Sequence, residues 1–436
     1  MQLDTPDGRE NLVRFLHLSD IHFTDCGGPP EADLERAVRE RMLDDIRKMH
    51  ERHGAIDAVL VVGDIAARGK PADYVEAASF LDRTCTIVGI AAERVVCVPG
   101  NHDIDRDRQG ALHDAARFQL RRVDIERISD TLLRLLHDKD GRHTLLTPLE
   151  AYNEFAMRYG CAIDPDLLLW KPKVLDFGDR RLCIHGVNTA WICDRSDSAE
   201  RDAERVILGL FQLAPVAEDA SAISVALCHH PLRWLRDKEL VTPWLARAQV
   251  LLTGHEHEPG VGASEDQRWL RIASGAVNPG RTDARWIPAY NVIELELSAD
   301  DRLQVRVFAR SWQVDYAEFG PDRTAPEPVS FEVRLSPRAE TRKAVVLPSA
   351  ERSSGPSESP PEMAVPKPVP EPLVSDERSM VYRVMRASRD RRRRAARKLG
   401  LLVEQEQQDG LALDKAVVRR ALAEGRLAEL TRMIHG

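Results

Sequence analysis

Five short stretches of this sequence combine aspartate, histidine and asparagine at the spacing that metal ligands need. In chain order they are Ser19-Asp20-Ile21-His22, Gly63-Asp64, Gly100-Asn101-His102-Asp103, His229-His230-Pro231 and Gly254-His255-Glu256-His257. In an extended Asp-x-His or His-x-His step, the first and third side chains point the same way and can reach one ion. Imidazole nitrogens with carboxylate and amide oxygens suit Mn, Fe, Zn or Co. The sequence therefore predicts a site for divalent cations.

Each stretch closely follows an apolar run that is typical of a buried strand. The runs are 13–18, 58–62, 95–98, 223–227 and 250–252. Several are continuous rather than alternating, as in strands that are buried on both faces. Ligands of α/β proteins bind outside the carboxyl ends of strands, so five such ends would bring these residues into one crevice. Gly63, Gly100 and Gly254 predict sharp turns or close backbone approach within it.

The other segments predict the layers around these strands. Apolar residues at helical spacing predict helices over 31–53, 72–84 and 112–137, and the first pattern stops at Gly54. Three later runs, 290–297, 303–309 and 329–335, predict meander strands. Together these patterns indicate a layered α/β sandwich of mixed sheets. The segment 104–175 is an insertion with helical patterning, which either covers a sheet face or forms a cap that selects substrate.

The order DxH…GD…GNHD…HHP…GHxH, from Asp20 to His257, resembles the signature of the calcineurin-like metallophosphoesterases. The resemblance implies a four-layer αββα sandwich and a hydrolase with two metal ions. It assigns Asp20, His22 and His257 to one metal, Asn101, His229 and His255 to the other, and Asp64 as the bridge between them. Two such cations clamp phosphoryl oxygens and lower the pKa of a bridging water, which gives a hydroxide at neutral pH.

The resemblance also implies residues that would act on the substrate. His102 would lie near the substrate phosphate, with Asp103 as its orienting partner, and both are candidate catalytic residues. His230 would stand outside the metal ligands and contact the substrate. Apart from the resemblance, the position of Arg68 shortly after Asp64 predicts a phosphate contact through its guanidinium, and the open alternative is a solvated loop charge.

Charge is distributed unevenly along the 436 residues. The chain has 62 basic and 70 acidic side chains, a net charge of −8, whereas residues 377–436 have 15 basic and 8 acidic side chains. An acidic body disfavours a long nucleic-acid track but accommodates a small nucleotide. No run of about 18 apolar residues is present, so no membrane-spanning helix is expected. Without a secretory leader or CxxC pairs among the seven cysteines, we expect a cytoplasmic protein with reduced thiols.

Composition divides the chain into three parts. Residues 1–337 would form the metallophosphoesterase domain, and 338–376 a Pro/Ser-rich linker that is expected to be disordered. Residues 377–436 predict a small basic helical module that binds a protein partner. An enzyme tethered to such a module resembles, in layout, bacterial conflict-system effectors with adaptor domains.

These patterns favour a binuclear metal-dependent phosphodiesterase that hydrolyses a nucleotide or nucleic-acid phosphoester. The preference for diesters comes from the resemblance, because GNHD, HHP and GHxH look closer to cyclic-nucleotide phosphodiesterases and nucleases than to Ser/Thr phosphatases. Two alternatives stay open. One is a DNA or RNA nuclease, and the other is an adaptor or scaffold whose tail recruits a partner while the hydrolase core is regulated or idle.

Overall fold

A computed structural model describes most of the first 335 residues and a few short segments near the C-terminus. The described residues are 2–3, 10–24, 34–164, 170–194, 205–213, 222–279, 287–298, 300–324, 327–335, 397–399, 420–421, 426, 428–429 and 433. The chain divides into two compact units, Met1–Ala344 and Val345–Gly436. The predicted linker 338–376 lies outside the described residues, and so does most of the predicted module 377–436.

One mixed sheet carries the first three predicted ligand-bearing strands. Its order is β13-β12-β11-β2-β3-β4, and β14 pairs with β12. The bounds are β2 Leu12–Leu18, β3 Ala58–Val62, β4 Val95–Val98, β11 Ala289–Leu297, β12 Arg302–Gln313, β13 Glu318–Pro321 and β14 Val329–Arg334. The strands β2, β3 and β4 are parallel, whereas β11 to β14 are antiparallel. The predicted runs 290–297, 303–309 and 329–335 correspond to β11, β12 and β14, and β13 was not predicted.

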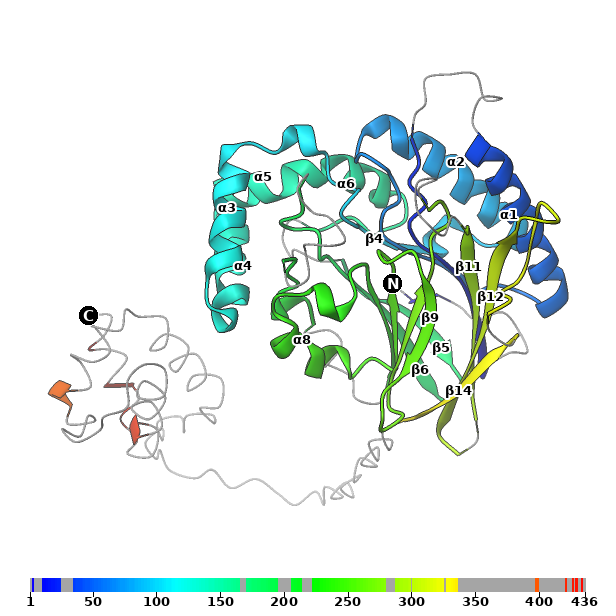
Figure 1. Cartoon of the computed structure of the whole chain (residues 1–436). Coiled ribbons are helices and arrows are strands. Elements are labelled where there is room, and N and C mark those ends of the chain that lie inside the picture. Colours follow the sequence, from blue (N-terminus) through cyan, green and yellow to red (C-terminus); the bar gives the residue numbers. More distant parts are fainter. Residues whose placement is uncertain are drawn as a thin grey trace, which may run out of the picture. The chain divides into compact units, whose positions relative to one another are not determined.

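A second mixed sheet carries the other two ligand-bearing strands (Figure 1). Its order is β1-β5-β6-β7-β8-β10-β9. The bounds are β1 Gln2–Leu3, β5 Lys173–Phe177, β6 Arg180–Val187, β7 Ile223–Cys228, β8 Val250–Thr253, β9 Pro259–Ala263 and β10 Leu270–Ser274. Every residue of β7 and β8 is buried, which agrees with their continuous apolar runs.

Helices pack against the sheets and bury their apolar faces. Helices α1 (Leu34–His53) and α2 (Pro71–Val88) adjoin the first sheet, and Tyr290 of β11 donates a hydrogen bond to Asp45 of α1 at 2.7 Å. Helix α8 (Lys238–Leu245) lies between β7 and β8 in the chain. The predicted α/β sandwich with two mixed sheets is therefore confirmed. Among the described residues, no helix combines the length and apolar composition that a membrane crossing requires.

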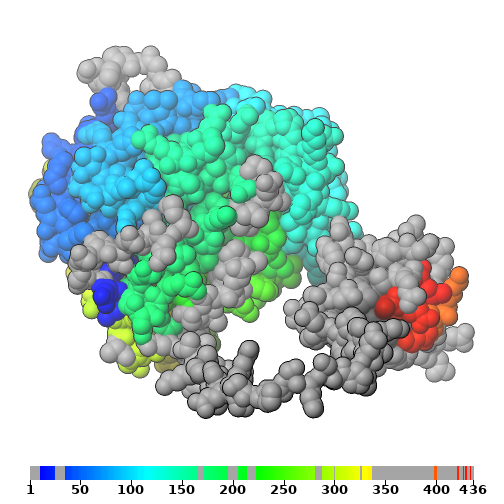
Figure 2. Space-filling view, turned by 180° about the vertical axis from the view of Figure 1, so that it is seen from behind, coloured from blue at the N-terminus to red at the C-terminus, as the bar shows by residue number. Residues whose placement is uncertain are grey.

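The insertion is helical, but the pattern predicted over 112–137 is not one helix. It forms α3 (Ala111–Arg122) and α4 (Ile128–His137), followed by α5 (Lys139–Leu146) and α6 (Glu150–Met157). Val123 and Asp124 adopt extended backbone, so the chain turns and α4 packs back against α3. The residues coloured cyan form one surface with the neighbouring blue and green segments in Figure 2.

The end of the insertion covers the first sheet. Tyr152 of α6 donates a hydrogen bond to the carbonyl of Cys97 in β4 at 3.1 Å, and Phe155 stacks on Tyr74 of α2. Helix α4 of the insertion instead contacts a later segment of the chain, since Ser129 accepts a hydrogen bond from the backbone N–H of Leu210. The role of a substrate-selecting cap stays a prediction.

Candidate metal centre

The predicted stretches meet where the two sheets come together. The backbone N–H of Asp20 donates to the carbonyl of Gly63 at 3.1 Å, and that of Gly254 donates to the carbonyl of His229 at 3.0 Å. His229, after β7, also pairs its Nδ1 with the carbonyl of Val62 at the end of β3, at 2.8 Å. Because β3 and β7 belong to different sheets, this contact joins the sheets at the site.

The backbone of the ligand-bearing loops is unusual. Five of the predicted ligands have φ values between 50° and 69°, a left-handed region that non-glycine residues rarely adopt; they are Asp20, His22, Asp64, His255 and His257. Such conformations persist only where the surroundings hold them, and they concentrate at functional sites. The loops are therefore shaped by their neighbours rather than by local preference.

Two glycines make room for the ligands. A Cβ atom on Gly63 would collide with the imidazole of His229, and one on Gly100 would collide with the carboxylate of Asp64. The predicted close approach at these glycines thus has a steric cause.

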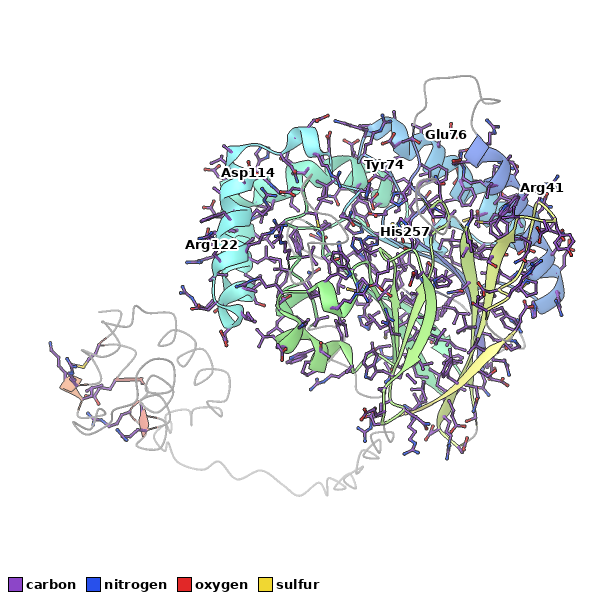
Figure 3. The ribbon with its side chains drawn as sticks, in the orientation of Figure 1. Arg41, Tyr74, Glu76, Asp114, Arg122 and His257 are labelled. Atoms are coloured by element: carbon purple, nitrogen blue, oxygen red, sulfur yellow. The ribbon has the colours of Figure 1, made fainter. Side chains whose placement is uncertain are left out.

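Asp20, His22 and His257 form one group of potential ligands. Their donor atoms lie within 4.8 Å of one another. Asp20 Oδ1 is 3.3 Å from His257 Nε2, and the Nε2 atoms of His22 and His257 are 3.5 Å apart. Asp20 is fully buried, and among the described residues its Oδ1 has no hydrogen-bond partner. Figure 3 shows His257 near the middle of the ribbon, far from the outer helix of Asp114 and Arg122. A cation would satisfy these facing lone pairs.

Asn101, His229 and His255 form the other group. Asn101 Oδ1 is 2.9 Å from His255 Nδ1 and 3.2 Å from His229 Nε2. The Val62 carbonyl can only accept, so His229 Nδ1 carries a proton, and Nε2 offers a lone pair to a cation once its own proton is lost. Asp64 Oδ2 lies 3.4 Å from His229 Nε2 and 4.0 Å from His22 Nε2, which places this oxygen between the two groups.

Both aspartates of the centre are held in the charged form. Burial alone would raise the pKa of Asp64, but His229 and His102 outweigh it and hold this pKa well below its usual range. Burial likewise opposes ionisation of Asp20, yet the nearby His257 and His229 rings lower its pKa to about 2. Two buried carboxylates side by side are a strong attraction for cations.

The histidines differ in charge. Burial lowers the pKa of His22 to about 4, and burial with the neighbouring His229 lowers that of His255 to about 3. Both rings therefore offer a lone pair at neutral pH. Burial would also lower the pKa of His229, but the charge of Asp64 raises it to about 9. Without bound metal, the extra proton on His229 thus supplies part of the positive charge that a cation would place next to Asp64.

The two candidate catalytic residues lie beside the centre, but they do not pair as expected. His102 Nδ1 is 2.9 Å from the carbonyl of Ala67, and its ring contacts that of His22 edge to face at 4.7 Å. Asp103 instead accepts hydrogen bonds from the backbone N–H groups of Ile65, Ala66 and Gly100 and from the hydroxyl of Tyr74. Asp103 orients the loops rather than His102, because its oxygens are used by donors from three segments.

The two predicted substrate contacts are engaged within the protein. Arg68 Nη2 lies 2.5 Å from Asp73 Oδ1, although its side chain is half exposed. His230 is buried and its Nδ1 is 2.6 Å from Thr189 Oγ1. Their roles with substrate stay predictions.

Sequence reasoning missed four residues that support the ligands. Ser19 Oγ donates to Asp20 Oδ2 at 2.5 Å, and Tyr74 binds Asp103. Trp234 and Glu256 form a hydrogen bond next to His255. Glu256 lies inside the predicted GHEH stretch, but no pattern in the sequence indicates its partner.

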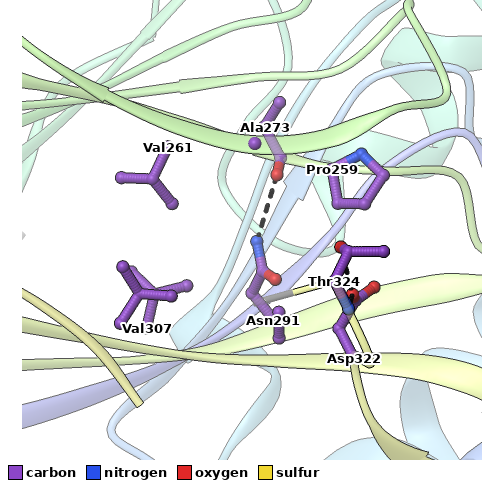
Figure 4. Close-up of a pocket in the computed structure, with 10 residues that line it drawn as sticks. Pro259, Val261, Ala273, Asn291, Val307, Asp322 and Thr324 are labelled. Atoms are coloured by element: carbon purple, nitrogen blue, oxygen red, sulfur yellow. Dashed lines mark hydrogen bonds between the residues drawn. The ribbon is translucent and has the colours of Figure 1, made fainter. Parts of the chain in front are cut away.

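A cavity of about 220 Å³ lies between the two sheets (Figure 4). It is bounded by Pro259 and Val261 of one sheet and by Asn291 and Val307 of the other, and Asn291 donates a hydrogen bond to the carbonyl of Ala273 at 3.3 Å. None of the predicted site residues lines it. The candidate chemistry belongs to the histidine and aspartate cluster.

The donor set fits divalent cations. Buried carboxylates, neutral imidazoles and an amide oxygen meet at one point, and Asp20 Oδ1 is buried without a protein donor among the described residues. An α/β sandwich with two mixed sheets and this cluster at the strand ends defines a metallophosphoesterase architecture.

The chain belongs to the calcineurin-like phosphoesterase family, whose model matches residues 13–259, more than half of the chain. It is 34% identical over 96 residues to the uncharacterized metallophosphoesterase-like protein YydB of Bacillus subtilis (strain 168), a match that spans 22% of this chain and 18% of that protein. Among solved structures, it is similar to Vacuolar Protein Sorting 29 from Cryptosporidium parvum (12% identity, TM-score 0.32, 74% of this chain and 99% of that chain). It is also similar to the sulfate thiohydrolase SoxB of Thermus thermophilus (15% identity, TM-score 0.34, 70% and 57%).

Proposed function

We propose that this chain is a phosphodiesterase that uses two divalent cations, with Mn, Fe, Zn and Co as the candidate metals. One cation would be held by Asp20, His22 and His257, the other by Asn101, His229 and His255, with Asp64 shared. The observation that carries this proposal is the position of Asp64 Oδ2, which lies within 4.0 Å of nitrogen donors from both groups. A single carboxylate between two donor sets is what a shared ligand requires.

When bound, such cations would place positive charge next to the phosphoryl oxygens and lower the pKa of a bound water, so that it ionises near neutral pH. The remaining steps fall to the protein. Because the Ala67 carbonyl accepts from His102 Nδ1–H, the Nε2 atom of His102 is left to exchange a proton with a substrate oxygen. The partly exposed His102 ring lies against His22, so this proton would be delivered next to the centre. The backbone N–H of His102 donates to Asp64 Oδ1 at 2.7 Å, which fixes the His102 loop to the shared ligand.

The proposed substrate class is a nucleotide or nucleic-acid phosphodiester. The family membership supports a phosphoester substrate, the acidic body favours a small one, and Arg68 and His230 are its proposed contacts. The proposal also includes a protein partner for residues 377–436, whose excess of basic side chains suits an acidic surface.

The test uses the purified full-length chain. Metal content is measured by elemental analysis, and hydrolysis of bis-p-nitrophenyl phosphate is followed with Mn²⁺, Zn²⁺, Fe²⁺ or Co²⁺ added. Cyclic nucleotides, dinucleotides, single-stranded DNA and RNA then define the substrate. We expect two metal ions per chain and hydrolysis that is abolished by EDTA. A folded chain that binds no metal and hydrolyses none of these compounds would refute the proposal.

A further inference from the structure

A salt-bridged glutamate joins the two segments that carry His229 and His255. Glu256 follows His255, and its Oε1 lies 2.7 Å from Arg233 Nε. The same oxygen accepts a hydrogen bond from the indole Nε1–H of Trp234 at 3.1 Å. Arg271 Nη1 lies 3.7 Å from the other carboxylate oxygen. The segment after β7 is thus tied to the segment after β8 by side chains rather than by backbone alone.

Trp234 also determines where the His255 ring can lie. Its indole meets the imidazole of His255 at right angles, with ring centroids 4.3 Å apart. His230 packs on the same imidazole at 4.5 Å. With His229, which meets it edge to face at 5.4 Å, the His255 ring contacts three aromatic rings, and its Nδ1 lies 2.9 Å from Asn101 Oδ1.

The backbone gives a reason why His255 needs such support. His255 and His257 both have left-handed φ values, of 69° and 55°. A three-residue stretch with two left-handed residues would move to more favourable φ values unless its surroundings held it in place. Glu256, which lies between them, provides the side-chain attachment that holds the loop.

We propose that Arg233, Trp234 and Glu256 form a clamp that positions His255 for one of the two cations. The proposal rests on the proposed function, since it assigns positioning residues to that same metal centre. Trp234 fixes the ring plane of His255, Glu256 fixes Trp234 and the loop, and Arg233 neutralises Glu256. Partners of metal ligands typically change metal affinity by 10- to 100-fold when they are removed.

The clamp acts on one cation more than on the other. His22 and Asp64 are held by backbone contacts between the loops after β2 and β3, at 3.0 Å from His22 N to Asp64 O. Asp20 is held by Ser19 as well as by the backbone N–H of His255. The Trp234 indole contacts the His255 ring, whereas the His257 ring contacts that of His22, so the clamp reaches His255 directly and His257 only through the loop that they share. Loss of the clamp therefore disturbs the donor set of Asn101, His229 and His255 first.

The experiment is a titration of the metal-free full-length chain with Mn²⁺ by calorimetry. Asn101→Ala and His22→Asn each remove a ligand from one group and identify which binding step belongs to which cation. We expect Glu256→Ala to weaken the step that Asn101→Ala removes by 10- to 100-fold and to change the other step less than 3-fold. Glu256→Gln keeps an acceptor for Trp234 Nε1–H and should recover part of the affinity, whereas Trp234→Phe should resemble Glu256→Ala.

Matched controls separate positioning from general packing. Trp244→Phe makes the same exchange on α8, where the Arg247 guanidinium lies 4.7 Å from the ring centroid. Arg268→Ala removes a guanidinium that is 73% exposed, against 70% for Arg233, and that pairs with Asp266. Neither control should change Mn²⁺ binding.

Each outcome decides between the two proposals. A wild-type chain without Mn²⁺ binding would refute the proposed function, whatever the variants do. Two binding steps in the wild type that are unchanged in Glu256→Ala and Trp234→Phe would overturn the clamp and leave the metal centre intact. Equal weakening of both steps would overturn it as well, because the clamp is selective. If Trp234→Phe does not fold, the exposed Arg233→Ala decides through the same selective loss.

Discussion

Two carboxylates organise the loops of the candidate metal centre, and they do so in different surroundings. Asp103 is fully buried and binds three backbone N–H groups and the Tyr74 hydroxyl, all from the half built on β3 and β4. Glu256 has a side chain that is 14% exposed and binds Arg233 and Trp234 in the half built on β7 and β8. A buried acceptor leaves several donors unsatisfied when it is lost, whereas water can replace the largely exposed Arg233 in its ion pair. Loss of Asp103 is therefore expected to lower the free energy of unfolding more than loss of the Arg233 ion pair.

The two halves differ in their candidate ligands as well as in these supports. The loops after β2, β3 and β4 carry the oxygen donors Asp20, Asp64 and Asn101, whereas the loops after β7 and β8 carry the histidines His229, His255 and His257. Substitution of the shared ligand Asp64 is therefore expected to weaken the binding of both cations. Substitution of Asp103 is expected to lower the free energy of unfolding, and substitution of Arg233 is expected to weaken metal binding with little effect on stability.

The largest effect is expected for Asp64→Asn, which removes the shared charge. Metal-dependent hydrolysis should fall by more than about 100-fold, since even partners of metal ligands cost 10- to 100-fold. The fold should survive, because asparagine still accepts from the His102 N–H and the buried negative charge is gone. Metal content and circular dichroism of the variant check both parts.

A buried carboxylate elsewhere provides the control for that variant. Asp45 binds Arg310 and Tyr290, away from the predicted ligands. Asp45→Asn should lower the free energy of unfolding and keep two metal ions per chain. Retention of both metals and full hydrolysis in Asp64→Asn would contradict the assignment of the shared ligand.

The next effect is on stability, through Asp103→Asn. The amide NH₂ group would face backbone donors that need an acceptor, so the free energy of unfolding should fall by about 3 kcal/mol. Tyr74→Phe removes only the hydroxyl donor and should cost about 1 kcal/mol. Urea denaturation in EDTA measures both values without a contribution from bound metal. Equal values for the two variants would mean that the backbone N–H groups do not depend on Asp103.

The sequence predicted the parts of this site that are local in the chain. The ligands follow apolar runs directly, so Asp20, Asp64 and His229 could be assigned to strand ends from residue type and order alone. The partner of His102 could not be predicted, since the Ala67 carbonyl is backbone and carries no signal in residue type. Asp103 was expected to orient His102 because the resemblance to the family implies that pairing.

Long-range contacts account for the other differences. Trp234 and Glu256 are 22 residues apart and meet only because β7 and β8 are adjacent in the second sheet. The left-handed φ values of the ligands follow from contacts between loops and not from residue type. The break between α3 and α4 was missed because apolar spacing continues across Val123.

The loss of stability at acid pH has a separate source in each sheet, because each sheet contains one buried neutral histidine among the described residues. Burial lowers the pKa of His185 in β6 to about 4, and that of His17 in β2 to about 3. The unfolded chain takes up a proton near pH 6.5 while the folded chain does not, so stability falls as the pH drops from about 7 toward 4. For His185 the loss at pH 4.5 is on the order of 2 kcal/mol.

The variant His185→Gln isolates the contribution of the second sheet. It removes the titrating group and keeps a polar partner for Ser224, which lies 3.3 Å from His185 Nε2. The difference in unfolding free energy between pH 7.5 and pH 4.5, measured in EDTA, should be smaller in the variant by about 2 kcal/mol. An unchanged difference would show that His185 is protonated in the folded chain.

The smallest effect on stability is expected for Arg233→Ala, and it gives the sharpest test of the comparison. The Arg233 side chain is 70% exposed, so its ion pair with Glu256 is screened by water and should contribute less than about 1 kcal/mol to the free energy of unfolding. The same substitution should still weaken the binding of one Mn²⁺ ion, since the position of a ligand depends on geometry more than on total stability. A loss of 2 kcal/mol or more in EDTA would mean that Glu256 supports the fold as Asp103 does, and the difference between the two halves would disappear.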